Sequence, residues 1–205
     1  ISLLGTSGAQ AASLTVTPAA ITNDFKGVVT LEIAGLTNGQ TVTVEKLVDL
    51  NANGAADDAE LFLRRFTVTD GQVPSIGGVR NRNVPGDDDG AANGEIRVEL
   101  SYPGLDDWLS GVAARFLFKV SDPDNGFSPV VAGVDVQPSP QAQDAQVTIT
   151  ATGGVVGPSL AGTLILLTDT WGDTVAAAFT DLSGRCTNFV TPGDYGVMAL
   201  RTGYV

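Results

Sequence analysis

The chain contains no histidine and only one cysteine, Cys186, among its 205 residues. Without histidine it cannot form a Ser-His-Asp triad, a Cys-His pair or a histidine-based zinc site. One cysteine excludes an internal disulfide and cannot assemble a zinc centre, so Cys186 is expected to pack as a small hydrophobic side chain. No run of about 18 apolar residues is present, and the sequence therefore predicts no membrane-spanning helix.

Basic residues are also scarce, with 11 Lys and Arg against 23 Asp and Glu and a formal net charge of −12. This balance disfavours nucleic acid and anionic membranes as partners, because both repel an acidic surface. Bound cations would relieve the self-repulsion. Aromatic residues make up 6% of the chain, so a sugar-stacking platform has few residues to draw on. Its candidates are Trp108, Trp171, Tyr102 and Tyr204, and for each the favoured role is packing in the core or in a turn.

What the chain has in quantity is short segments in which apolar and polar residues alternate, separated by turns rich in glycine and proline. Alternation with period two predicts half-buried strands, and each segment is too short and too regular for a helix. The expected strands are residues 13–18, 27–33, 41–47, 61–69, 96–100, 112–120, 145–153, 162–168, 175–180 and 195–200. The pattern is typical of antiparallel sandwiches.

A break at residues 121–126 marks the expected domain junction, which divides the chain into residues 1–127 and 128–205. After it, Val134-Asp-Val136-Gln-Pro138 echoes Leu14-Thr-Val16-Thr-Pro18, which suggests two related units in tandem. The predicted fold class is all-β, with two tandem Ig-like antiparallel β-sandwich domains. The first carries a calcium loop and an N-terminal strand.

The most specific pattern is residues 49–60, where oxygen-bearing side chains recur at alternate positions. The spacing matches an EF-hand calcium loop, with glycine at position six and glutamate at position twelve. A hard cation prefers about six to eight oxygens, so alternate residues of a tight loop must point inward, and Gly54 permits the sharp turn. The predicted Ca²⁺ ligands are Asp49, Asn51, Asn53, Ala55 (through its backbone carbonyl), Asp57 and Glu60.

A rival interpretation treats residues 51–54 as a plain hairpin turn, because Asn-Gly is the strongest two-residue hairpin signal. The flanking segments alternate with period two, so the loop is expected to join strands rather than the helices of an EF-hand. Without the helix pair that opens in calcium sensors, a structural cation is favoured over a signalling one.

A second acidic cluster, Asp87-Asp88-Asp89-Gly90, precedes another strand. Adjacent aspartates repel each other unless a cation or solvent separates them. Three alternatives remain for these aspartates: they hold a second ion, they add ligands to the first ion site, or they form a solvated loop tip. The candidate ligands are Asp87 and Asp89. Asp70 is placed either at one of these sites or in a turn.

The C-terminal part contains Phe179-Thr-Asp-Leu-Ser-Gly184-Arg185, Val190-Thr-Pro-Gly-Asp-Tyr195 and Gly203-Tyr-Val205. Over residues 160–205 this resembles the carboxypeptidase regulatory-like, transthyretin-like β-sandwich. The resemblance implies a non-catalytic spacer or interaction module of a secreted protein, here without the strand that normally follows the glycine-tyrosine pair. The first half resembles calcium-loop β-sandwich modules of bacterial surface proteins.

These features favour a structural or adhesive module of an extracellular surface protein or filament, stiffened by calcium. Self-association by strand exchange is expected, with the apolar residues 1–14 as the candidate donor; residues 1–12 also match the tail of a signal peptide. The alternative is a carbohydrate-binding module of a secreted hydrolase that binds a glycan. An enzyme is disfavoured, because the paired carboxylates Asp106 and Asp107, and Asp122 and Asp124, lie in predicted turns.

Overall fold

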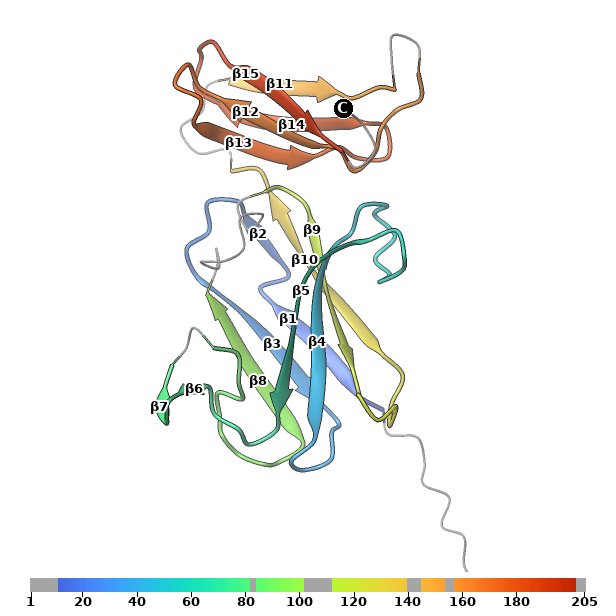
Figure 1. The fold of residues 1–205 in the computed structure, drawn as a ribbon, viewed down its shortest axis with the longest axis vertical. Coiled ribbons are helices and arrows are strands. Elements are labelled where there is room, and N and C mark those ends of the chain that lie inside the picture. Colours follow the sequence, from blue (N-terminus) through green and yellow to red (C-terminus); the bar gives the residue numbers. More distant parts are fainter. Residues whose placement is uncertain (1–10, 82–83, 102–111, 140–144, 154–156, 202–205) are drawn as a thin grey trace, which may run out of the picture.

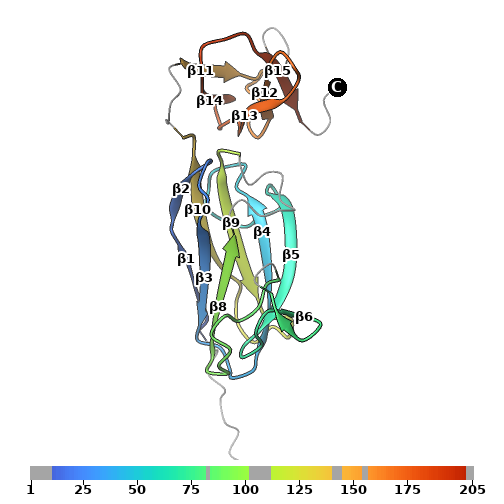
Figure 2. The same cartoon turned by 90° about the vertical axis from the view of Figure 1, so that its left-hand side faces the viewer.

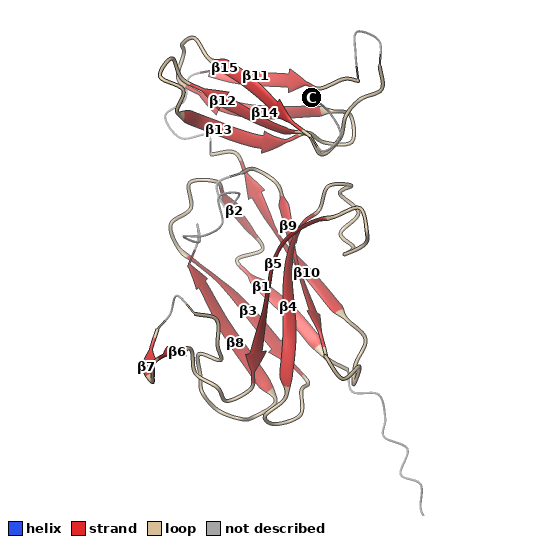
Figure 3. Cartoon of the chain, viewed as in Figure 1, coloured by secondary structure: helices blue, strands red, loops and turns tan. Residues whose placement is uncertain are grey.

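The computed structural model describes residues 11–81, 84–101, 112–139, 145–153 and 157–201. Every regular element in these ranges is a β-strand, and they contain no helix (Figure 3). This confirms the all-β fold class. The strands form two groups, in residues 13–137 and 145–200, and the second group lies at one end of the first (Figures 1 and 2).

The first group is built from two sheets and a short hairpin. Its strands are β1 Ser13–Thr17, β2 Ala20–Thr22, β3 Val28–Ala34, β4 Thr41–Val48, β5 Leu61–Thr69, β6 Ser75–Ile76, β7 Val79–Arg80, β8 Glu95–Ser101, β9 Arg115–Ser121 and β10 Val130–Gln137. One sheet has the order β1-β3-β8 and the other the order β2-β10-β9-β4-β5, while β6 and β7 pair only with each other.

The chain passes from one sheet to the other between β1 and β2, through the cis Thr17–Pro18 peptide. β1 pairs antiparallel with β3, whereas β2 pairs parallel with β10. The remaining pairs of the two sheets are antiparallel. This is the strand order of an Ig-like sandwich whose first strand is shared by both sheets.

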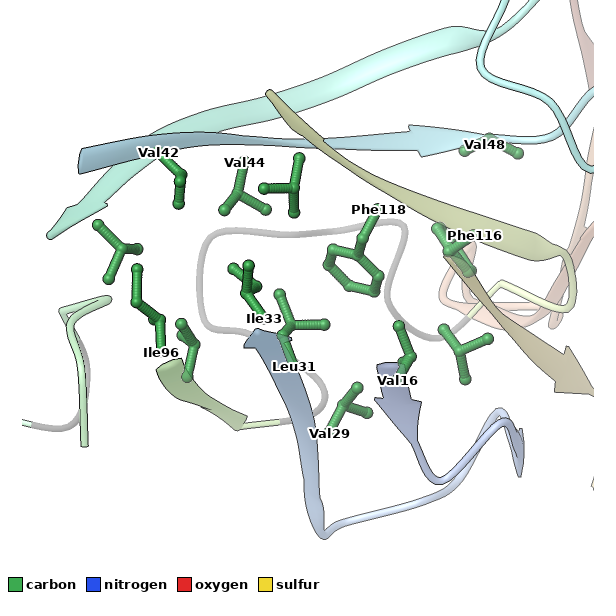
Figure 4. Close-up of a cluster of buried hydrophobic side chains, with 14 of the residues drawn as sticks. Val16, Val29, Leu31, Ile33, Val42, Val44, Val48, Ile96, Phe116 and Phe118 are labelled. Atoms are coloured by element: carbon green, nitrogen blue, oxygen red, sulfur yellow. The ribbon is translucent and has the colours of Figure 1, made fainter. Parts of the chain in front are cut away.

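Alternation along the strands selects the side chains that fill the core between the sheets (Figure 4). In β3, Val29, Leu31 and Ile33 are at most 1% exposed. They face Phe116 and Phe118 of β9, which lie in the same cluster. Each such side chain contributes about 1.5–3 kcal/mol when removed from water, so this core dominates the stability of the first group.

The second group is a smaller sandwich. Its strands are β11 Ala145–Thr150, β12 Leu164–Thr168, β13 Thr174–Phe179, β14 Arg185–Val190 and β15 Gly196–Leu200. β11 pairs with β14, and β13, β12 and β15 form the facing sheet, with every pair antiparallel. Cys186 is buried beside Ile165 and Ala178, and burial raises the pKa of its thiol. It packs as a small hydrophobic residue, as predicted.

The structure corrects the interpretation of residues 134–138 as the start of the second unit. β10 pairs with β9 and β2, and Val134 and Val136 are 1% and 3% exposed in the core of the first group. The two groups therefore meet between Gln137 and Ala145, later than the predicted division after residue 127. β14 was not among the predicted strands, because Arg185–Val190 mixes polar and apolar residues.

Apolar contacts join the two groups. Leu164 of β12 is 4% exposed and belongs to the core cluster of the first group. Ala113, just before β9, donates its N–H to the carbonyl of Ala177 at 3.4 Å. A Cβ placed on Gly162 would lie 3.4 Å from Cδ2 of Leu50, so the loop after β4 touches the second group directly.

Candidate metal centre

The segment 49–60 joins β4 to β5 at the end of the sandwich that faces the second group. Its flanks are strands, as the alternation predicted. Gly54 has a φ of +72°, the left-handed conformation expected for position six of the loop. Ala52 is also left-handed, with a φ of +58°, a conformation that an L-residue with a Cβ adopts at a cost.

Asp49 organises the turn from its first position. Its side chain is completely buried and accepts the N–H groups of Asn53 at 3.2 Å and Gly54 at 2.9 Å. The guanidinium of Arg115, on β9, lies 3.7 Å from the same carboxylate. Sequence reasoning missed Arg115; its signal was a charged residue at the start of the strand that pairs with β4.

Asn51, Asn53 and Asp57 are held together by hydrogen bonds. The Nδ2 atoms of Asn51 and Asn53 donate to Asp57 at 3.3 and 2.8 Å. Their Oδ1 atoms accept the backbone N–H groups of Asn53 and Ala55 at 3.0 and 2.7 Å. The N–H of Ala59 and the amide of Asn53 lower the pKa of Asp57, which is therefore held in its charged form.

Glu60 closes the loop with one satisfied and one unsatisfied oxygen. Its Oε2 accepts the N–H of Leu50 at 2.6 Å, whereas Oε1 is buried and has no hydrogen-bond partner. Burial raises the pKa of Glu60, and the negative charges of Asp49 and Asp57 add to this effect. A buried carboxylate oxygen near two other carboxylates is a position that a cation would stabilise.

The predicted ligands are oxygens, which suits a hard cation such as Ca²⁺. Within the described ranges, however, no three or more Asp, Glu, Cys or His side chains are gathered as a metal cluster requires. The side-chain amides of Asn51 and Asn53 turn their nitrogens toward Asp57. An ion could use these residues only if the amides presented their oxygens instead.

The second acidic cluster is satisfied by the protein itself. Asp87 is fully buried and accepts the N–H groups of Gly71 at 2.8 Å and Arg97 at 3.1 Å. Asp89 is exposed and accepts the N–H of Ala91 at 2.7 Å. Protein donors thus reach both candidate ligands and relieve the repulsion that suggested a second ion.

Asp70, whose role the sequence left open, accepts a hydrogen bond from the loop that follows the second cluster. It is 3% exposed and accepts the N–H groups of Gly39 at 2.7 Å and Gly94 at 3.0 Å. Gly39 precedes β4 and Gly94 precedes β8, so a single carboxylate ties together two loops at the end of the sandwich away from residues 49–60.

Two further groups of predicted residues have structural roles. Asp122 accepts the N–H groups of Asp124 and Gly126, which places this pair in the turn that was predicted. Asp181 accepts the N–H groups of Ser183 and Arg185, so this part of the motif behind the transthyretin-like resemblance stabilises a turn. Asp106 and Asp107 lie outside the described residues.

Trp171 contradicts its expected packing role. It is 88% exposed in the turn between β12 and β13. Asp169 fixes this turn by accepting the N–H groups of Trp171 at 2.8 Å and Asp173 at 3.0 Å. The other aromatic candidates, Trp108, Tyr102 and Tyr204, lie outside the described residues.

In the described part of the chain, no helix is long and apolar enough to cross a membrane. No protein-family model matches the sequence. No curated protein matches it either.

Comparison with solved structures finds weak matches to β-sandwich proteins. A native α-2-macroglobulin fragment from Escherichia coli, spanning domains MG0-NIE-MG1, has 12% identity and a TM-score of 0.33, covering 94% of this chain and 64% of that one. The T6 backbone pilin of Streptococcus pyogenes has 12% identity and a TM-score of 0.28, and the match covers 95% of this chain and 49% of the pilin chain. The tandem V-type regions of the chitin-binding protein VCBP3 have 12% identity and a TM-score of 0.28, and the match covers 87% of this chain and 79% of the VCBP3 chain. At this level the matches carry no argument about function, and the Ig-like assignment stands on the strand pairing.

Proposed function

We propose that this chain is a structural module of an extracellular surface protein or filament, stiffened by Ca²⁺ bound at residues 49–60. The observation that supports calcium is Oε1 of Glu60, a buried carboxylate oxygen without a partner in the loop that has the EF-hand spacing. Asp49 and Asp57 add negative charge beside it. The chemistry supplied by the ion would be electrostatic and structural.

The position of the loop supports a stiffening role. Leu50, the second residue of the loop, lies against Gly162 of the second group and packs on the core of the first. Its N–H is held by Glu60. A cation bound by Glu60 would therefore restrain the loop that contacts the second sandwich, and the module would resist bending between the two sandwiches.

The test is thermal unfolding of the full chain with saturating Ca²⁺ and with chelator. Binding to the native state alone should stabilise it by about 3–4 kcal/mol at roughly 100 to 1,000 times Kd. Asp57→Asn should reduce this gain strongly. Asp58→Asn is the matched control, because Asp58 is exposed and occupies the next position outside the predicted ligand set. Equal responses of the two variants would exclude the proposed ligand set, and indifference of the parent to chelator would exclude calcium.

The proposal includes self-association by strand exchange. The second group has two sheets of only two and three described strands, which leaves strand edges that another chain can pair with. Sedimentation velocity and electron microscopy of the purified chain should show oligomers that grow with concentration. A protein that stays monomeric throughout would contradict this part.

Trp171 favours a second candidate, a carbohydrate-binding module. A tryptophan that is 88% exposed on a turn fixed by hydrogen bonds is suited to stack on a sugar ring. We propose no catalytic residue for either candidate. Glycan-array binding that is lost in Trp171→Ala and kept in Leu182→Ala, another exposed residue of the second group, would favour this function over the structural one.

A further inference from the structure

β15 is the longest of the described strands whose residues are all exposed. All five of its residues are exposed, including Val197 at 59%, Met198 at 51% and Leu200 at 45%. It pairs with β12 on one side, and no described strand pairs with its other edge. In a complete sandwich at least one face of such a strand would be buried.

The edge of β15 also lacks the features that normally prevent pairing with other chains. Exposed edge strands are usually protected by charged residues, proline or bulges. Residues 196–200 contain neither charge nor proline, and their pairing with β12 is regular. By contrast, β5, the edge of the large sheet, carries Arg64 and Arg65.

We propose that the edge of β15 accepts residues 1–10 of a second copy of this chain as an added strand. This segment is uncharged, and the first charged residue of the chain is Asp24. In a protein with a net charge of −12, an uncharged segment is the part that can approach another copy with least repulsion. Ile1, Leu3 and Leu4 supply apolar side chains to match Val197, Met198 and Leu200.

The geometry favours a second copy over the same chain. Ser13 pairs with Ala34, at the end of the first sandwich where β4 begins, whereas the end of β4 leads to Leu50 and the second group. The eight residues of β4 span about 26 Å. Residues 1–12 reach about 40 Å when fully extended, so crossing the sandwich would leave only about four residues for pairing.

The resulting contact is head-to-tail, because β1, which follows the donor segment in the sequence, begins at the end of the first sandwich away from the second group, and the second group carries β15 (Figure 1). A heterologous contact of this kind repeats and yields filaments unless the rotation between copies closes a ring. The inference rests on the self-association in the proposed function and identifies the surface that performs it.

The experiment uses two variants of the full chain, each lacking one half of the contact. Deletion of residues 1–10 removes the donor and keeps Ala11 and the whole of β1. Met198→Lys places a charge on the acceptor edge. Val79→Lys is the matched control, because Val79 is a 70% exposed strand residue of the first group. Near-ultraviolet circular dichroism and thermal unfolding check that each variant is folded.

In sedimentation velocity, each of the two variants alone should lose assembly, while Val79→Lys assembles as the parent does. Mixing the deletion variant with Met198→Lys should restore a 1:1 complex and nothing larger, because one supplies only the acceptor and the other only the donor. The inference is overturned if the parent assembles and either variant assembles equally well, or if the mixture stays monomeric; self-association would still stand. A monomeric parent would overturn both.

Discussion

The two acidic regions of the first sandwich share a composition and differ in how their carboxylates are satisfied. Around Asp70 and Asp87, buried carboxylates accept two or more backbone N–H groups each. In residues 49–60, Asp49 is satisfied in the same way, but Glu60 keeps one buried oxygen without a partner. The carboxylates of the first region are satisfied by protein donors, whereas the second region leaves one buried carboxylate oxygen without a donor.

The difference teaches that acidic density alone does not indicate a metal. A buried carboxylate is stabilised equally well by N–H groups of neighbouring loops, which act as fixed partial positive charges. What distinguishes the loops is the balance of donors and acceptors. Removing a carboxylate should therefore damage the fold in one region, and should alter the response to calcium in the other.

The largest effect is expected for Asp87→Ala. It leaves the N–H groups of Gly71 and Arg97 buried without their acceptor, which should lower the free energy of unfolding by roughly 3 kcal/mol. The loss should be the same with calcium and with chelator, as measured by urea unfolding. Asp89→Ala is the control: Asp89 is exposed, and its loss should cost under about 1 kcal/mol. A loss for Asp87→Ala that appears only with calcium would mean that this region also binds an ion.

Much of the fold followed from alternation, because one buried face dictates apolar residues at every second position, as in Val29, Leu31 and Ile33. Residues 130–137 were misassigned because two valines alternate in the same way in either sandwich. Their pairing with β9 depends on contacts distant in sequence. In the candidate site, the spacing identified Glu60 and the turn at Gly54, but it could not show Arg115 or the amide orientations, which are set by tertiary neighbours.

Glu60→Gln should act in opposite directions under two conditions. With chelator, the neutral side chain no longer sets a buried charge against Asp49 and Asp57, so the melting temperature should rise. With saturating calcium, the variant should lose most of the gain seen in the parent, because an amide replaces the carboxylate that closes the loop. Differential scanning calorimetry under both conditions measures this reversal. A melting temperature that falls equally in both would assign Glu60 a purely structural role.

The pH dependence of the chelated protein gives the same contrast within one loop. Folding raises the pKa of Glu60. Its contribution to stability is therefore present at pH values below the pKa of Glu60 in the unfolded chain, and it is lost as the pH rises through the pKa in the folded chain. Folding lowers the pKa of Asp57. Its contribution is therefore present at pH values above the pKa of Asp57 in the unfolded chain, and it is lost as the pH falls through the pKa in the folded chain. Unfolding between pH 3 and 7 should therefore show a less steep gain with pH in the parent than in Glu60→Gln.

The smallest effect concerns the backbone. Ala52→Gly should stabilise the chain by about 0.5–1 kcal/mol, because glycine adopts the left-handed conformation of residue 52 without the clash of a Cβ, although it also makes the unfolded chain more flexible. Ala55→Gly, in the same loop outside the left-handed region, should instead destabilise by a similar amount. If bound calcium keeps the present backbone, the gain from Ala52→Gly will be equal with and without the ion. If the gain disappears with calcium, ion binding has moved residue 52 out of this conformation, and the loop closes around the cation by rearrangement rather than by turning the amides of Asn51 and Asn53 alone.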